Sequence, residues 1–337
     1  MKQRIKRLCE AMGVGGVGDI AEVIARDIAP FVDTVEIDAL GSVIATRRCQ
    51  NPEAPTLLLE AHMDEIGFVV THIDDDGFVH VTNCGGIDRR VLAATEVVVL
   101  AEEPLVGVFC STPPHLAGED KSLPKLEAMG IDIGLSAEEA RRRIPKGTRV
   151  GFRPLYRELG EHRVSVKALD DRIGCAAVIR ALELLKDEKL NVHVTALFAV
   201  QEEIGGAGAR VAAFSRTPTA AVATDVSFAL TPDAPAHKCG ELGKGQMLGI
   251  APGLDYALTE QMRTLATTHG IAYQTEAMGG DTGTDADGIV GTKDGVRTVL
   301  LSIPQRYMHT PVEVIDVRDA EAVATWMALA AKEGLGV

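Results

Sequence analysis

Two histidines and several carboxylates in this chain follow apolar runs that are typical of β-strands. TLLLEA (56–61) is followed by His62 and Asp64, VHVTALFAV (192–200) by Glu202 and Glu203, TAAVA (219–223) by Asp225, and VRTVLLSI (296–303), after a short turn, by His309. Ligands of an open α/β sheet bind outside the carboxyl ends of its strands, so we expect these side chains to converge. Neutral imidazole and carboxylate oxygens together bind divalent metal ions, and the predicted chemistry is therefore metal-dependent.

The pair His62 and Asp64 has the spacing of a metal ligand and its supporting carboxylate. Alternate residues of a strand point to the same side, so Asp64 can accept a hydrogen bond from the imidazole and fix its tautomer. The alternative is an exposed histidine followed by a turn aspartate, and an H-x-D pair by itself does not decide between them.

Asp170 and Asp171, in KALDDRIG, stand where a helix is predicted to begin. Aspartate is a preferred helix cap, which explains at least one of them. An aspartate can also bridge two cations with its two oxygens. Both roles can occur together, with one residue capping and the other bridging.

Glu202 and Glu203, in QEEIGGAGA, are adjacent carboxylates at the end of a very apolar run. Two such groups in one pocket repel each other unless a cation or a proton is present. Their side chains diverge, so one can bind metal while the other faces the reacting water. The alternative is a pair of solvated glutamates on a turn.

The composition excludes several classes of function. The net charge of −14 argues against nucleic acid and anionic membranes as partners, because both are bound through Lys and Arg, and 4% aromatic residues are too few for base stacking. No run approaches the roughly 18 apolar residues of a membrane span, and the basic opening segment lacks the apolar core of a signal peptide. The six cysteines lie singly, so we expect reduced thiols and a cytoplasmic protein.

The chain divides into blocks with different patterns. Residues 1–66 and 167–337 alternate helical and strand-like segments, which predicts one α/β domain. Residues 67–166 carry short strand-like runs separated by glycine, proline and acidic turns, with one helical stretch at SAEEARRRI. We predict a mixed sheet flanked by helices, interrupted by an inserted, mainly β domain.

Five motifs in this chain resemble those of the tetrahedral aminopeptidases, metallopeptidase family forty-two, also labelled glutamyl aminopeptidase or cellulase M. They are, in order, AHMDEIGF, KALDDRIGC, QEEIGGAGA, ATDVS and MHTPVEVID. The resemblance covers essentially the whole chain, including a β-rich insertion between the first two motifs. It implies a zinc-exopeptidase-like fold in which residues 67–166 form the dimerisation domain of a homo-oligomer, a hollow tetrahedral dodecamer.

The resemblance also implies a role for each of the site residues. It predicts two zinc or cobalt ions with these ligands: His62 and Asp225 on one, Glu203 and His309 on the other, and Asp170 as the bridge. Asp170 rather than Asp171 is the bridge because the family keeps the first Asp of this motif and tolerates Asn at the second. Glu202 would be the general base, and Asp64 would orient His62.

The residues and the resemblance together predict a metallo-aminopeptidase, a hydrolase that removes N-terminal residues from short peptides. Two metal ions would share a water, and Glu202 would take its proton and pass it to the leaving amine. The main alternative is a glycosidase, since paired carboxylates also hydrolyse sugars, but that chemistry needs no histidines. A non-catalytic assembly subunit would have lost the base, and Glu202 is present.

Two segments depart from the family pattern. GVGGVGD lacks the serine and glutamate often found near the N-terminus, and GTDADGI carries Asp287 where a small residue is common. The resemblance places this second loop near the substrate. We therefore expect Asp287 to line the substrate pocket, where its carboxylate would repel an acidic side chain and favour a lysyl or arginyl one. The alternative is a solvated loop aspartate.

Overall fold

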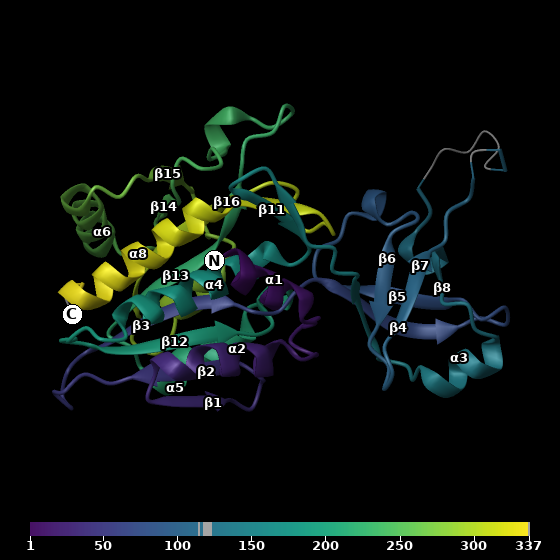
Figure 1. Cartoon of the computed structure of the whole chain (residues 1–337), viewed down its shortest axis with the longest axis horizontal. Helices are drawn as coiled ribbons and strands as arrows, with labels where there is room; N and C mark the ends of the chain where they lie inside the picture. Colours follow the sequence, from purple (N-terminus) through teal and green to yellow (C-terminus); the bar gives the residue numbers. More distant parts are fainter. Residues whose placement is uncertain (114, 117–122, 336–337) are drawn as a thin grey trace.

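The computed structural model describes residues 1–113, 115–116 and 123–335, which form a large α/β body and a smaller β-barrel beside it (Figure 1). The helices are α1 (Lys2–Glu10), α2 (Ile20–Ile28), α3 (Ala137–Arg143), α4 (Leu169–Leu185), α5 (Ala207–Arg216), α6 (Tyr256–His269), α7 (Asp285–Val290) and α8 (Val317–Glu333). Within the described residues, none of the helices combines the length and the apolar character needed to cross a membrane.

The large body is built on an eight-stranded sheet in the order β1-β2-β12-β3-β13-β16-β14-β15. Its strands are β1 (Thr34–Ile37), β2 (Val43–Arg47), β3 (Thr56–His62), β12 (His193–Ala199), β13 (Ala220–Phe228), β14 (Met247–Ile250), β15 (Gln274–Ala277) and β16 (Arg297–Gln305). The four central strands, β12, β3, β13 and β16, run parallel, whereas β2 and β14 are antiparallel to their inner neighbours. The predicted mixed sheet is confirmed, and the carboxyl ends of its parallel strands meet at one edge.

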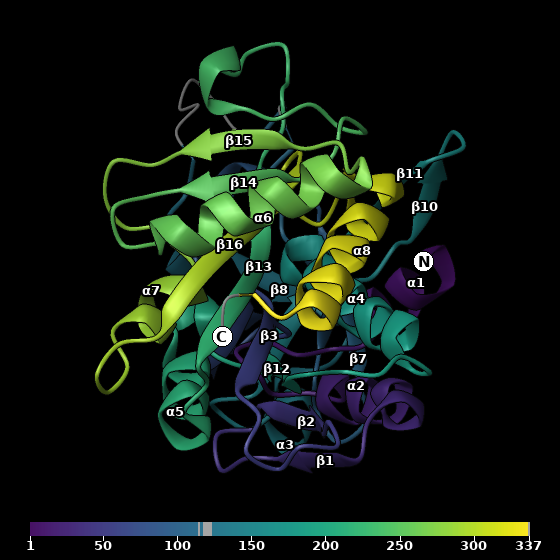
Figure 2. The ribbon, with the colours of Figure 1, turned by 90° about the vertical axis from the view of Figure 1, so that its left-hand side faces the viewer.

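Helices cover both faces of this sheet (Figure 2), which explains why the central strands are nearly continuous apolar runs. α1, α2, α4, α6 and α8 pack on one face around the main core, and α5 and α7 pack on the other around a smaller one. Trp326 of α8 is fully buried in the main core and donates its indole N–H to the Met262 carbonyl at 3.0 Å.

The barrel closes in the order β4-β5-β8-β7-β6-β9. Its strands are β4 (Gly67–Ile73), β5 (Val79–Cys84), β6 (Glu96–Val99), β7 (Leu105–Phe109), β8 (Gly130–Asp132) and β9 (Arg149–Phe152). Three aromatic rings fill its core, with Phe68 meeting Phe109 and Phe152 edge to face at 5.0 and 5.6 Å between centroids. The predicted insertion, 67–166, contains this barrel. It also contains β10 (Arg157–Leu159) and β11 (Arg163–Val166), which form a three-stranded sheet with β17 (Glu313–Asp316).

Two local expectations differ from the structure. The strand predicted at 219–223 continues to Phe228, so Asp225 lies inside it, because β13 pairs with β16 over its whole length. The glycine-rich loop around Asp287 contains the short helix α7, because the Thr284 side chain caps its first turn by accepting the Ala286 N–H at 3.2 Å.

Candidate metal centre

The residues predicted to bind the metal ions come from distant segments and meet at the carboxyl edge of the parallel strands. Their positions are these: His62 ends β3, Asp225 lies in β13, Glu202 and Glu203 form a short 3-10 turn after β12, Asp170 lies at the start of α4, and His309 lies in the loop between β16 and β17. The parallel strand order is what brings them together, since all four strands present their carboxyl ends to the same side.

His62, Asp170 and Asp225 form the first of two clusters, with ligand atoms within 4.8 Å of one another. The Nε2 atom of His62 lies 3.0 Å from Oδ1 of Asp170 and 3.8 Å from Oδ1 of Asp225. All three side chains are buried. One imidazole nitrogen and two carboxylates are a donor set that suits zinc and similar divalent ions.

Asp170, Glu203 and His309 form the second cluster. The Nε2 atom of His309 lies 3.3 Å from Oδ2 of Asp170 and 3.3 Å from Oε2 of Glu203. Asp170 therefore presents a different oxygen to each histidine. This arrangement is the one that a carboxylate bridging two cations requires.

Asp64 and Glu202 lie beside the clusters and belong to neither. Oδ1 of Asp64 lies 3.6 Å from Nδ1 of His62, and it accepts the backbone N–H of Glu202 at 3.1 Å. Asp64 thus contacts the histidine of the first cluster and holds the backbone of Glu202. The Glu202 side chain stays outside both candidate ligand sets.

The two adjacent aspartates of KALDDRIG have different surroundings. Neither Asp170 nor Asp171 has helical backbone angles, so regular helix begins after them. Oδ1 of Asp171 accepts the N–H of Gly174 at 3.1 Å, which is the hydrogen bond of a helix cap. Of the two possibilities for this pair, Asp171 caps the helix while Asp170 faces the histidines.

The electrostatics of the site favour the presence of cations. Burial, reinforced by the charge of Asp170, raises the pKa of Glu203 to about 10. Burial also raises the pKa of Asp225 well above its usual range, against the opposing effect of His62. Burial acts in the same direction on Asp170, but hydrogen bonds from His309 and His62 lower its pKa overall. Buried carboxylates whose charges are this unfavourable gain from a bound cation, so the residues present fit divalent metal ions.

The sequence did not reveal two further contacts of the site. Gly86, just after β5 of the barrel, lies against the His309 ring, so close that a Cβ at Gly86 would be 3.2 Å from Nδ1 of that ring. Glu60, two residues before His62 in β3, is fully buried, and burial together with the nearby carboxylate of Asp285 in α7 raises its pKa well above its usual range. A charged residue inside an apolar strand is a signal that could have pointed to Glu60. No local pattern predicts the approach of Gly86.

Asp287 lies in the first turn of α7 and outside both clusters. Its carboxylate accepts the N–H and hydroxyl of Thr282 at 3.0 and 2.8 Å and the N–H of Gly283 at 3.0 Å. The side chain therefore shapes the loop that precedes α7.

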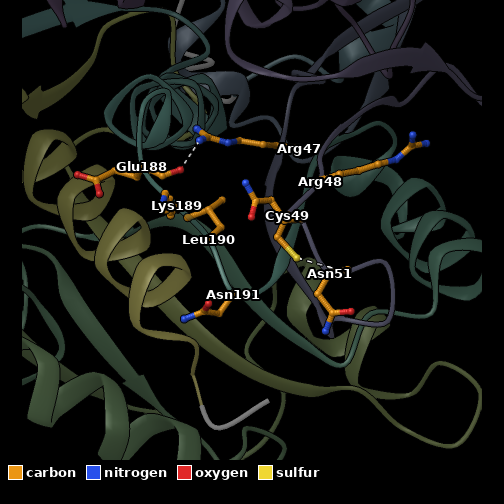
Figure 3. Close-up of a pocket in the computed structure, with 9 residues that line it drawn as sticks. Arg47, Arg48, Cys49, Asn51, Glu188, Lys189, Leu190 and Asn191 are labelled. Carbon is orange, nitrogen blue, oxygen red and sulfur yellow. Dashed lines mark hydrogen bonds between the residues drawn. The ribbon is translucent and has the colours of Figure 1, made fainter.

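One cavity is lined by residues that directly precede His309, and another lies away from both clusters. A cavity of about 410 Å³ has a largely apolar wall that includes Phe228, Tyr307 and Met308, the last two directly preceding His309. A second, of about 500 Å³, lies between the end of β2 and the segment before β12, where Arg47 donates to the Glu188 carbonyl at 2.8 Å (Figure 3). Because β2 is antiparallel to β12, this second cavity lies at the opposite edge of the sheet from the metal ligands.

Comparisons with known proteins agree with this site. The profile described as M42 glutamyl aminopeptidase matches residues 41–325. The "Lysyl aminopeptidase" of Pyrococcus furiosus is 36% identical over 330 residues, covering 94% of this chain and 92% of its own length. An aminopeptidase from the archaeon Desulfurococcus kamchatkensis superposes with a TM-score of 0.93 at 33% identity, covering 99% of this chain and 94% of that one.

A third relative carries information about assembly. The TET1 peptidase of Pyrococcus horikoshii, described as able to assemble into a tetrahedron or a large octahedral shell, has a TM-score of 0.86 and 33% identity. The match covers 98% of this chain and 99% of that one. Since the family profile and these full-length relatives agree, the chain belongs to the M42 glutamyl aminopeptidase family and is a metal-dependent aminopeptidase.

Proposed function

We propose that this enzyme removes N-terminal residues from peptides with two divalent metal ions, zinc or cobalt, one in each cluster. The observation that carries the proposal is the position of Asp170, whose Oδ1 and Oδ2 face His62 and His309 respectively. Asp225 and Glu203 each complete one of the two sets. The family implies a divalent metal cofactor, and the donor atoms supply two places for it.

When bound, the metal ions would act as Lewis acids toward the attacking water and the scissile carbonyl. Glu202 takes the proton of that water and delivers it to the departing amine. Its backbone is held by Asp64, and burial raises its pKa against the opposing effect of His62. A base whose pKa is closer to neutrality transfers protons more effectively, a contribution of about 10²- to 10⁴-fold. Asp64 also keeps His62 oriented toward Asp170.

The surroundings of the clusters fit a peptide with a free N-terminus. The buried carboxylates attract an α-ammonium group, and the apolar cavity of about 410 Å³ before His309 suits an apolar side chain of the substrate. Asp287, on its loop, disfavours an acidic side chain and favours a lysyl or arginyl one. The names of the relatives do not decide which N-terminal residue the enzyme prefers, since one relative is named for lysyl residues and the family for glutamyl ones.

The enzyme also assembles with copies of itself, in our proposal as a tetrahedral dodecamer built from dimers through residues 67–166. Support comes from the relatives, whose structures include a dodecamer and a tetrahedral shell. We also propose that the enzyme is cytoplasmic, because its six cysteines are all unpaired, as is usual in that compartment. Light scattering of the purified enzyme tests the assembly: twelve chains are expected, and a monomer at micromolar concentration contradicts it.

The activity is tested with peptides that differ only at the N-terminus. The enzyme is expected to release the first residue of a free peptide and to leave the N-acetylated peptide intact. A chelator should stop the reaction, and zinc or cobalt should restore it. Equal cleavage of both peptides would indicate an endopeptidase, and metal-independent hydrolysis of a β-glucan would favour a glycosidase.

A further inference from the structure

We propose that Glu313 is a positioning residue that fixes the separation of two metal ligands, Asp170 and His309, by binding the backbone of both. Its Oε2 atom accepts the N–H of Asp170 at 3.1 Å, and its Oε1 atom accepts the N–H of His309 at 3.0 Å. One side chain thus joins the start of α4 to the loop after β16. The inference rests on the proposed function, in which both ligands serve metal ions.

Glu313 is itself held in place by burial and by strand pairing. It is 1% exposed and begins β17, where it pairs with Val166 of β11. β11 ends at Val166, shortly before Asp170 in the chain. This strand therefore pairs with the backbone of Glu313 and also leads to Asp170, whose N–H the Glu313 side chain binds. The two groups that bind the carboxylate are backbone N–H donors on different segments, and a side chain with two acceptor oxygens satisfies both.

His309 depends on such support. Its φ of 60° is left-handed, a strained conformation that a residue other than glycine keeps only when its surroundings enforce it. Gly86 lies against the imidazole ring, and Glu313 binds the backbone N–H. Without the second contact, the loop is free to leave the left-handed conformation and withdraw Nε2 from Asp170 and Glu203. The His309 cluster is therefore the one expected to weaken.

The substitution Glu313→Gln tests this at nearly constant size. The amide keeps one acceptor oxygen and turns the other into an NH₂ donor, so either the Asp170 N–H or the His309 N–H meets another donor. Zinc affinity is measured on chelator-stripped enzyme by competition with a chromophoric chelator. We expect one zinc ion to bind about 10- to 100-fold more weakly, the loss typical when the support of a metal ligand is removed.

Asp319→Asn is the matched control. Asp319 is also 1% exposed, and its two oxygens accept the N–H groups of Gly243 at 2.7 Å and Gly245 at 2.9 Å, away from both clusters. The chemical change is the same, a buried carboxylate replaced by an amide between two backbone donors. We expect a lower melting temperature in this variant and wild-type affinity for both zinc ions.

The outcomes separate positioning from general stability. The inference is overturned if Glu313→Gln binds both zinc ions with wild-type affinity, or if Asp319→Asn loses as much affinity. If Glu313→Gln does not fold, hydrogen exchange of the stripped wild type decides: protection of the His309 amide is expected, and rapid exchange overturns the inference. Failure of the proposed function looks different, because wild-type enzyme would then bind fewer than two zinc ions.

Discussion

Asp170 links the two halves of the site, because each of its oxygens faces a different histidine. Glu202 stands apart from both halves, with its backbone held by Asp64. Chemistry and metal binding are therefore assigned to different members of the Glu202–Glu203 pair. That division can be tested one residue at a time.

Glu202→Gln should lower turnover by about 10²- to 10⁴-fold, the usual contribution of a general base, and leave the metal content unchanged. Glu203→Gln, its neighbour, should lose metal from the His309 cluster, because Oε2 of Glu203 lies 3.3 Å from the His309 Nε2. Metal analysis and initial rates on both variants check this. If metal is lost from Glu202→Gln and kept in Glu203→Gln, the two roles are exchanged.

Asp287→Ala should change the ranking of substrates. Removing the carboxylate frees the Thr282 and Gly283 N–H groups and lessens the discrimination against an acidic side chain. A tenfold change needs only about 1.4 kcal/mol. A charge pair at about 4 Å with an effective dielectric near 20 is worth up to about 4 kcal/mol before desolvation, so a shift of about tenfold toward the glutamyl substrate is expected. Comparing lysyl, leucyl and glutamyl substrates measures it. An identical ranking in both proteins removes Asp287 from substrate selection.

Individual site residues were predictable where strand periodicity and a motif coincided. His62, Glu203 and Asp225 follow or lie in apolar strands, and their side chains do converge. Glu313 belongs to the motif MHTPVEVID, but the sequence predicted no role for it, because its side chain binds backbone groups, one of them at Asp170, far away in the sequence. The close approach of Gly86 to the His309 ring was not predicted either, because the two residues lie far apart in the sequence.

At the level of elements, α4 depends on the close packing of its first turn. A Cβ at Gly174 would lie 2.3 Å from Oδ2 of Asp171 and 2.3 Å from Cγ2 of Thr224. Gly174→Ala should therefore lower stability by about 1–3 kcal/mol, the usual cost of overpacking. Thermal melting measures the effect. Gly253→Ala is the control, because nothing lies within 4 Å of its Cβ, and equal melting temperatures for the two variants would contradict this packing argument.

Sequence patterns predicted some of the helices and strands and missed the features that depend on distant strand pairing. The apolar runs predicted the central strands, and Ser136 capping α3 agrees with the helical stretch predicted at SAEEARRRI. The end of β13 was missed, because its pairing with β16 continues through Asp225. The pairing of β11 with β17 joins residues about 150 positions apart, and no local pattern contains such information.

At the scale of the whole molecule, metal binding should couple to stability through pH. Without a cation, folded enzyme keeps the Glu203 proton up to a pKa of about 10, whereas the unfolded chain releases it near 4.5. The folded state then binds more protons, so this contribution to stability is complete below pH 4.5 and is lost as the pH rises toward 10. A bound cation favours the ionised carboxylate and opposes this loss.

Metal-free enzyme should therefore melt at progressively lower temperatures from pH 5.5 through 7 to 8.5, while metal-loaded enzyme should change less. Thermal melting with and without chelator at these three values checks the prediction. Parallel curves for the two forms would show that the buried carboxylates of the clusters do not carry the pH dependence.

Metal stoichiometry tests the two-metal account most directly. Calorimetric titration of chelator-stripped enzyme with zinc should give two ions per chain. Asp170→Ala should lose at least one of them, because its two oxygens face both histidines. A single ion in the wild type, or two ions retained by Asp170→Ala, would contradict the account.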